Sequence, residues 1–287
     1  MNGNNSFLTW EEAVAWLRTQ PDHAQLVFDC YYDDPLIEAA ERYWRSCEWT
    51  AVQNWLTMPK GVQAKALDVG AGRGIASYAL AKEGLNVTAL EPDDSALVGS
   101  GAIRSLAQET GLPIHVVENF SEHLPFDDGE FHIVFVRAAL HHSLDLVAAC
   151  KEFFRVLRPG GRLIIIREHV ISKQDDISDF LEHHPLHKFY GGENAYLLSQ
   201  YISAIEQSGF AKIKTILPWQ SPVNYAPFSL ERFKQNISTR IGLERPGIIQ
   251  MLNVFLGLPG VWKLIRQLLN QIDHRPGRLY SFIAEKR

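Results

Sequence analysis

The sequence has few of the features that mark several large protein classes. It contains only three cysteines, Cys30, Cys47 and Cys150, which lie far apart and form no C-x-x-C pair. Neither a disulfide framework nor a structural zinc site is therefore expected. Its 28 Lys and Arg residues are outnumbered by 33 Asp and Glu, which gives a net charge of -5. This balance provides no general attraction for nucleic acid, so we expect no nucleic-acid partner.

Long hydrophobic runs are also missing. The most apolar region, residues 247–272, is interrupted by Gly257, Pro259 and Gly260, whereas a membrane-spanning helix needs roughly 18 consecutive apolar residues. The first 20 residues begin with a polar stretch at 2–6 and then carry Glu11 and Glu12, so they lack the basic-then-apolar order of a secretory signal. We therefore expect no integral membrane segment, and a cytoplasmic location.

The pattern of the chain changes near residue 60. Residues 9–57 show helical spacing of apolar residues, beginning with the capping-box pair Thr9 and Glu12. This pattern predicts a helical N-terminal cap over 1–60, followed by one domain over 61–287.

From residue 66 onward, short apolar runs alternate with amphipathic helical segments, which is typical of βαβ units in a parallel sheet. The sequence predicts a doubly wound α/β fold in which helices cover both faces of a mostly parallel sheet. The predicted helices lie near 75–84, 94–110, 144–157 and 195–208, and the predicted strands are 66–69, 87–90, 114–117, 133–136, 163–166, 211–217 and 279–285. Residues 61–170 are the expected core. Residues 218–274 are a helical insertion before the last strand, with helical segments at 248–256 and 261–272.

A glycine-rich turn follows the first predicted strand. Asp68 comes two residues before the first glycine of a G-x-G-x-G sequence at 70–74, where glycine lets the backbone turn sharply and approach a ligand closely. The third glycine of a dinucleotide fingerprint would fall on Ile75, so that fingerprint is incomplete. Glu91 ends the second strand, where a carboxylate can accept hydrogen bonds from two ribose hydroxyls. Both features indicate a nucleoside-type cofactor.

Five motifs in this order resemble the class I S-adenosylmethionine-dependent methyltransferases. They cover roughly residues 60–170 and read Leu67-Asp68-Val69-Gly70-Ala71-Gly72-Arg73-Gly74, Glu91-Pro92-Asp93, Leu124-Pro125-Phe126-Asp127-Asp128-Gly129-Glu130-Phe131, Leu140-His141-His142 and Leu157-Arg158-Pro159-Gly160-Gly161.

The resemblance implies a seven-stranded Rossmann-like sheet with S-adenosylmethionine across the C-terminal ends of its first strands. It implies that Asp68 holds the amino-acid end and that Glu91 binds the ribose. The implied cofactor-binding residues are Asp68, Gly70, Ala71, Gly72, Gly74, Glu91, Pro92, Asn119, Phe120, Ser121 and Arg137. Phe120 stands where the family often has an Asp that contacts the adenine, and Glu118, Asn119 or Glu122 could replace it. His132 stands where the family often has an Asp before the fourth strand.

The segment 168–194 is rich in His, Glu, Tyr and Asn and begins at the ligand-binding edge of the sheet. We interpret it as a substrate-side loop whose His or Glu acts as a general base. Two alternatives remain: a divalent metal held by His183, His184 and His187 with Glu168 or Glu193, or ordinary loop residues with Asn194 as a helix N-cap. The predicted catalytic residues are His184, His187, Tyr190, Glu168 and His169, with no metal. The predicted substrate-binding residues are His141, His142, Glu193, Asn194 and Tyr32.

These observations predict a methyltransferase that transfers the methyl group of S-adenosylmethionine to an O or N atom of a small molecule, by in-line displacement. The alternatives are a nicotinamide-dependent oxidoreductase and a non-catalytic protein that binds S-adenosylmethionine. The apolar stripe of residues 261–272 indicates a lid or a homodimer contact through the 218–274 helices. Plain core packing and a membrane-surface contact are the alternatives.

Overall fold

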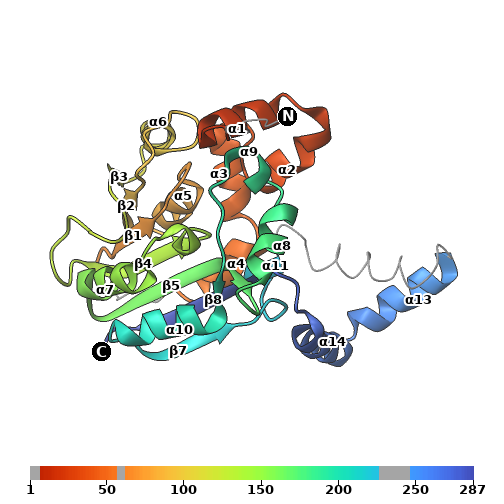
Figure 1. The fold of residues 1–287 in the computed structure, drawn as a ribbon. Helices are drawn as coiled ribbons and strands as arrows, with labels where there is room; N and C mark the ends of the chain where they lie inside the picture. The colour runs from red at the N-terminus through yellow and green to blue at the C-terminus, as the bar shows by residue number, and fades with distance from the viewer. Residues whose placement is uncertain (1–6, 57–61, 226–245) are drawn as a thin grey trace.

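A computed structural model describes residues 7–56, 62–225 and 246–287 of the chain. Its centre is a sheet in the order β3-β2-β1-β4-β5-β8-β7, and the two-residue strand β6 pairs with β5 outside this path. Strand β8 is antiparallel to both of its neighbours, and the other pairs are parallel. Helices cover both faces of the sheet (Figure 1). The predicted fold class, a doubly wound and mostly parallel α/β sheet, is confirmed.

The strands are Lys65–Val69 (β1), Asn86–Leu90 (β2), Ile114–Val117 (β3), Phe131–Arg137 (β4), Leu157–Ile171 (β5), Tyr196–Leu197 (β6), Ala211–Ile216 (β7) and Arg278–Glu285 (β8). The helices of the N-terminal half are Trp10–Arg18 (α1), Ala24–Asp29 (α2), Leu36–Trp44 (α3), Cys47–Gln53 (α4), Ile75–Lys82 (α5) and Ser100–Thr110 (α6). The later helices are Leu146–Val156 (α7), Asp176–His183 (α8), His187–Tyr190 (α9), Leu198–Gln207 (α10), Pro222–Tyr225 (α11), Pro246–Gly257 (α13) and Pro259–Ile272 (α14).

Two hydrophobic cores lie on opposite faces of the sheet. Alternate residues of each strand point to opposite faces, so Leu67 and Val134 pack against α7 and α10, while Ala66 and Ile133 pack against α3, α4 and α5. The central strands are buried on both sides, which is why they appear in the sequence as continuous apolar runs.

The N-terminal cap covers one of these faces directly. The capping box is present, with the Glu12 backbone N–H donating to Thr9 Oγ1 at 3.2 Å and the Thr9 N–H donating to Glu12 Oε2 at 2.8 Å. Trp49 of α4 is fully buried against Phe135 of β4. The cap is therefore packed into the same core as the sheet.

Several elements differ from their predicted bounds. Strand β5 already begins at Leu157, so the Pro-Gly-Gly sequence at 159–161 lies within the strand and not before it. Helix α6 begins at Ser100, because the chain from 94 to 99 forms a turn held by the Ser95 and Asp93 side chains. The segment 168–194 contains the end of β5 and two short helices, α8 and α9. Asn194 is not a helix N-cap, since α10 begins at Leu198 after the short strand β6.

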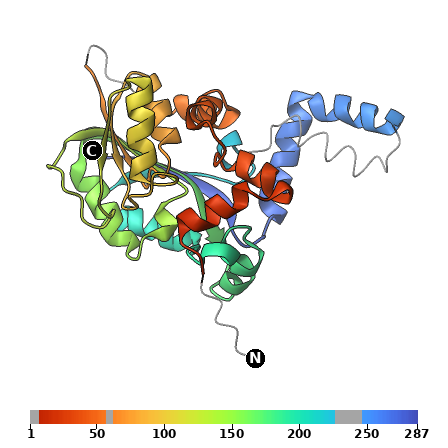
Figure 2. The same ribbon diagram turned by 90° about the horizontal axis from the view of Figure 1, so that it is seen from above.

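The insertion contains the two predicted helices as α13 and α14, which extend away from the sheet (Figures 1 and 2). Apolar side chains of both helices are exposed, among them Val254, Phe255, Leu264 and Leu268. The part of the insertion at 226–245 lies outside the described residues. Among the helices that the structure describes, none is long and apolar enough to cross a bilayer.

Candidate functional site

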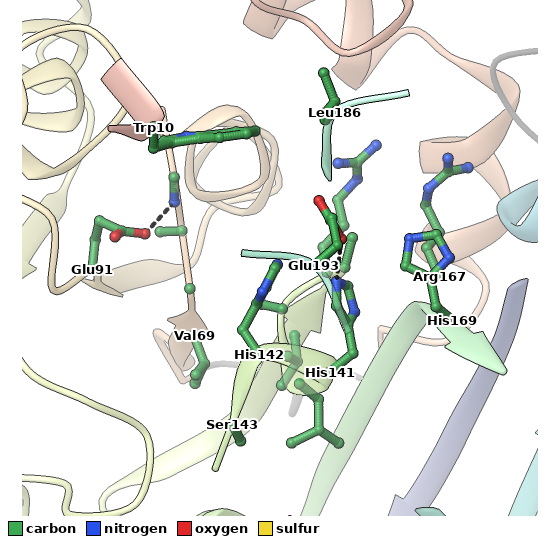
Figure 3. Close-up of a pocket in the computed structure, with 18 of the residues that line it drawn as sticks. Trp10, Val69, Glu91, His141, His142, Ser143, Arg167, His169, Leu186 and Glu193 are labelled. Atoms are coloured by element: carbon green, nitrogen blue, oxygen red, sulfur yellow. Dashed lines mark hydrogen bonds and ion pairs between the residues drawn. The ribbon is translucent and has the colours of Figure 1, made fainter. Parts of the chain in front are cut away.

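One cavity of about 1230 Å³ opens at the C-terminal ends of β1, β2, β4 and β5. This is the edge at which open α/β sheets bind ligands. Its lining joins the glycine-rich turn and Glu91 to a cluster of His and Glu side chains (Figure 3). The two halves that the sequence predicts separately therefore meet in one space.

The glycine-rich turn forms one wall of the cavity. Gly70 and Gly72 have φ of 65° and 54°, in the left-handed region that favours glycine. A Cβ at Gly70 would lie 2.5 Å from Cβ of Ala139, in the turn that follows β4. Glycine is thus required at position 70 both by its backbone conformation and by the close approach of a second turn.

Glu91 lies beside this turn. Its Oε2 accepts the backbone N–H of Gly72 at 2.7 Å, and its Oε1 accepts the N–H of Asp93 at 3.1 Å. Burial raises the pKa of the Glu91 carboxyl, and these two N–H groups partly offset that effect. The carboxylate is fixed in the cavity wall and keeps lone pairs for the two hydroxyls of a ribose.

Asp68 borders the cavity, and one of its two carboxylate oxygens has no hydrogen-bond partner among the described residues. Its Oδ2 accepts the hydroxyl hydrogen of Ser77 at 2.6 Å, but the buried Oδ1 has no partner among the described residues. Burial raises the pKa of Asp68 to about 7. An ammonium group would satisfy Oδ1 and favour the charged carboxylate, so this position fits the amino-acid end of the cofactor implied by the resemblance.

The segment after β3 forms the expected adenine side of the cavity. Asn119, Phe120 and Ser121 all line it, and the ring of Phe120 is exposed. Glu118 does not line the cavity, because its carboxylate binds Arg104 and Ser100 on the outer side. Of the three candidates to replace the missing Asp, Asn119 and Glu122 therefore remain.

His141 lies at the centre of the opposite half. Its Nδ1 is 2.8 Å from Oε2 of Glu168, and its Nε2 is 3.4 Å from Oε2 of Glu193. Burial lowers the pKa of His141, but the two carboxylates outweigh burial and raise it to about 9. In the absence of a ligand, His141 is therefore an imidazolium between two carboxylates.

Glu168 lies beneath the cavity and organises the turn after β4. Its Oε1 accepts the backbone N–H of Ala139 and Leu140, each at 3.2 Å, and its Oε2 accepts that of His141 at 2.9 Å. Glu168 is fully buried and is not among the residues that line the cavity, so its contacts favour a role in positioning His141. Its predicted role as a catalytic residue stays a prediction, which the burial of its carboxylate does not favour.

Glu193 reaches the cavity from the segment before β6. Its Oε1 accepts a short hydrogen bond from the hydroxyl of Tyr190 and is 3.8 Å from Nδ1 of His184. Burial raises the pKa of Glu193, but His141 and His184 together hold it well below its usual range. Glu193 is therefore ionised throughout the physiological pH range.

Two further imidazoles on the cavity wall each have one ring nitrogen with a hydrogen-bond partner among the described residues. Nδ1 of His142 is 3.0 Å from the carbonyl of Gly192, and Nδ1 of His169 is 2.9 Å from the carbonyl of Gly277. A carbonyl oxygen only accepts, so each Nδ1 carries the hydrogen and each neutral Nε2 keeps its lone pair. Burial lowers the pKa of both rings, most strongly at His169. Both are neutral proton acceptors near pH 7.

Most of the predicted site residues line this cavity, including Tyr32, His184 and Tyr190. Gly74, His187 and Asn194 do not. His187 lies in α9 with its ring against Phe7. Nδ1 of His184 accepts the N–H groups of Leu186 and His187, which places its hydrogen on Nε2. His184 is therefore a hydrogen-bond donor to the cavity when neutral.

Arg137 lines the cavity, but its guanidinium is already paired with a buried carboxylate. Its guanidinium donates to Oε1 of the fully buried Glu48 at 2.7 Å, and Arg167 lies 3.6 Å from the same carboxylate. Sequence reasoning missed Glu48, Arg167 and also Trp10, which lines the cavity from α1 and lies above Glu91 in Figure 3. Only Trp10 had a visible signal, as the aromatic residue directly after the N-cap Thr9.

Comparison with known proteins places the core of the chain in a family. Residues 67–165 match the family model described as a methyltransferase domain. These residues form a methyltransferase domain. The family that the five motifs predict is thereby confirmed.

Curated relatives and solved structures agree with this domain. The chain is 32% identical over 127 residues to demethylmenaquinone methyltransferase of Chlorobaculum tepidum, covering 44% of this chain and 49% of that protein. It is 28% identical over 204 residues to the ubiquinone/menaquinone biosynthesis C-methyltransferase UbiE of Bartonella tribocorum, covering 63% and 75%. The chain thus spans about half the length of the first relative.

The structure of phosphoethanolamine N-methyltransferase 2 from Haemonchus contortus, solved with S-adenosylhomocysteine, has a TM-score of 0.57. It is 20% identical, and the match covers 91% of this chain and 60% of that chain. At this identity, the likeness shows only that this chain and the Haemonchus contortus protein share a fold.

Proposed function

We propose that this methyltransferase domain binds S-adenosylmethionine and transfers its methyl group to an O or N atom of a small polar molecule. The observation that supports the proposal most is the single cavity that joins Glu91 and the glycine-rich turn to His142 and Glu193. A donor and an acceptor bound in these two halves share one space.

When bound, S-adenosylmethionine supplies an electrophilic methyl group on its sulfonium. Asp68 holds the ammonium through Oδ1, Glu91 holds the ribose hydroxyls, and Asn119 borders the adenine. Ser121 and Ser143, whose hydroxyls are 3.0 Å apart, close this side of the cavity. In-line transfer depends mainly on such positioning.

His142 is the side chain best placed to take a proton from the acceptor. It lies between Glu91 and Glu193 in Figure 3, and its Nε2 lone pair is available because Nδ1 donates to Gly192. The sequence predicted His142 as a substrate-binding residue, and this proposal adds a general-base role. His184 and Glu193 supply a donor and an acceptor for polar groups of the substrate.

Cofactor binding is tested by titration calorimetry with S-adenosylhomocysteine. Glu91→Gln should weaken binding about 10- to 100-fold, the value of one or two hydrogen bonds to a charged group. Glu118→Gln is the matched control, since that carboxylate lies outside the cavity, and it should bind like the wild type. No binding by the wild type at millimolar ligand would overturn the proposal.

Turnover is tested with labelled S-adenosylmethionine and a panel of hydroxylated and amino metabolites, with a demethylated quinone as the comparison. His142→Gln should lower kcat about 100-fold while leaving the affinity for S-adenosylhomocysteine unchanged. Methylation confined to a carbon of the quinone would overturn the O or N assignment. Binding without any methylated product would favour the non-catalytic alternative.

A further inference from the structure

The imidazole-carboxylate half of the cavity contains a group of potential metal ligands. One nitrogen each of His141 and His169 and one carboxylate oxygen of Glu193 all lie within 4.8 Å of one another. They come from three separate elements: the turn after β4, strand β5, and the segment before β6. This group shares only Glu193 with the metal alternative that the sequence suggested.

We propose that His141, His169 and Glu193 bind one divalent first-row transition-metal ion. Two imidazoles and a carboxylate are the ligand types of catalytic zinc sites and of related iron and manganese sites. The proposal concerns the side chains of this chain alone and does not depend on methyl transfer.

The distances between these side chains suit a shared ion better than direct hydrogen bonds. Nε2 of His141 is 3.4 Å from Oε2 of Glu193, which is long for a charge-assisted hydrogen bond. Two ligand atoms of a tetrahedral zinc ion, each about 2.1 Å from the metal, are about 3.4 Å apart. The longer separations to His169, up to 4.8 Å, would close by side-chain rotation when an ion binds.

Each ligand also has an outer partner of the kind that orients metal ligands. Nδ1 of His141 is held by Glu168 at 2.8 Å, and Nδ1 of His169 donates to the Gly277 carbonyl at 2.9 Å. These bonds leave Nε2 of both rings for the ion. The hydroxyl of Tyr190 donates to Oε1 of Glu193, which leaves Oε2 free to coordinate.

The charges balance as well. Glu193 and the buried Glu168 together carry two negative charges, which a divalent ion neutralises when both imidazoles are neutral. Arg167 and Arg137, which both line the cavity, lie 3.6 Å and 2.7 Å from the carboxylate of Glu48 and therefore already face a carboxylate. The competing arrangement is an ion pair in which a proton on His141 takes the place of the metal, and it predicts no metal binding.

The ion would leave coordination positions open towards the cavity. A hydroxyl or carboxylate oxygen of the acceptor could occupy such a position, which would hold the acceptor at the carbon that it attacks. This last step rests on the proposed function. The metal site itself does not, so the two can be tested separately.

The direct test is titration of the full-length, chelator-treated protein with Co²⁺ alone, followed by its visible absorption. We expect one ion per chain and the intense d-d bands between about 500 and 650 nm of a four- or five-coordinate site with nitrogen ligands. Zn²⁺ should displace Co²⁺ and abolish the bands, whereas Mg²⁺ should not, because it prefers oxygen ligands.

Variants assign the ligands. Glu193→Gln and His169→Gln should each lose the bands and weaken Co²⁺ binding at least 100-fold, and Tyr190→Phe should weaken it about 10-fold through its outer hydrogen bond. His115→Gln, an exposed histidine on β3, is the control and should bind like the wild type. Titration with S-adenosylhomocysteine reports whether each variant keeps the folded cofactor half.

Two results would overturn the inference. The first is a wild-type protein that binds no Co²⁺ at 1 mM or shows only the weak spectrum of the hydrated ion. The second is Co²⁺ binding that Glu193→Gln and His169→Gln leave unchanged. Loss of metal binding together with normal binding of S-adenosylhomocysteine supports the site without relying on the proposed activity.

Discussion

The guanidinium of Arg73, in the glycine-rich turn, donates a hydrogen bond to Oδ1 of Asp34 in the N-terminal cap at 2.5 Å. The same side chain donates to the backbone carbonyls of Tyr31 at 2.8 Å and Asp33 at 2.9 Å, and it is almost fully buried. One residue of the cofactor turn thus fixes the loop between α2 and α3.

We expect Arg73→Met to reduce the free energy of unfolding by about 2 kcal/mol, since it removes three hydrogen bonds to a charged donor and leaves two carbonyls without it. Denaturant unfolding measures this loss. Arg45→Met is the control, because Arg45 pairs with Glu41 on the surface and should cost less than about 0.5 kcal/mol. Equal losses in the two variants would show that the Arg73 contacts contribute little.

A second prediction concerns the close approach at Gly70. Gly70→Ala places a Cβ 2.5 Å from that of Ala139 at a φ of 65°, so it should destabilise the protein and abolish binding of S-adenosylhomocysteine. Gly111→Ala has nearly the same φ, 66°, but its Cβ meets nothing within 4 Å. It should cost only the strain of the left-handed backbone, about 1–2 kcal/mol, and leave binding intact. Thermal melts and calorimetry on both variants separate strain from steric clash.

The buried carboxyl of Asp68 gives a pH prediction. Burial raises its pKa from 3.8 to about 7, so between about pH 4 and pH 7 the folded protein binds a proton that the unfolded chain has lost. Asp68 therefore favours folding below pH 4, and this contribution is lost as the pH rises to 7, by up to about 1.4 kcal/mol per pH unit. Unfolding of the cofactor-free protein from pH 4 to 8 should show this slope. Asp68→Asn should flatten it, and an unchanged slope would contradict the assignment.

The homodimer expected from the sequence stays a prediction that α14 can test. Leu264 and Leu268 of this helix are 67% and 55% exposed, and apolar faces of this kind usually mark contact surfaces. We expect light scattering to show a wild-type dimer that Leu264→Glu with Leu268→Glu converts to monomer. Lys263→Glu changes the charge of the same helix without removing apolar surface and should leave the dimer intact. A monomeric wild type at 100 μM would refute the prediction.

The cofactor half could be predicted from the sequence because its determinants are local. The turn at 70–74 and Glu91 each follow directly on a buried strand, and the strand order then brings them together. The acceptor half depends on tertiary contacts. His141, His169 and Glu193 are separated by up to 52 positions in the printed sequence, and nothing in their spacing indicates that they converge.

The same difference between local and tertiary determinants explains why two predicted catalytic residues, His187 and Glu168, do not line the cavity. His187 belongs to the densest part of the 168–194 segment, but α9 turns its ring towards Phe7. Glu168 has the residue type of a base, but it is buried beneath the turn that it supports. Residue types alone predicted the chemistry of this region. The direction of the side chain was decided for His187 by the short helix α9 and for Glu168 by its place in β5.

The junction after the helical insertion limits how this protein can be re-engineered. Gly277 accepts the Nδ1 hydrogen of His169, donates its own N–H to the Val170 carbonyl at 3.0 Å, and would meet the ring of Phe180 at 2.2 Å if it carried a Cβ. A graft, truncation or fusion that exchanges α13 and α14 must therefore be spliced before Arg275. A splice placed three residues later would replace Gly277 together with the two helices, and it would release the imidazole of His169 in the cavity.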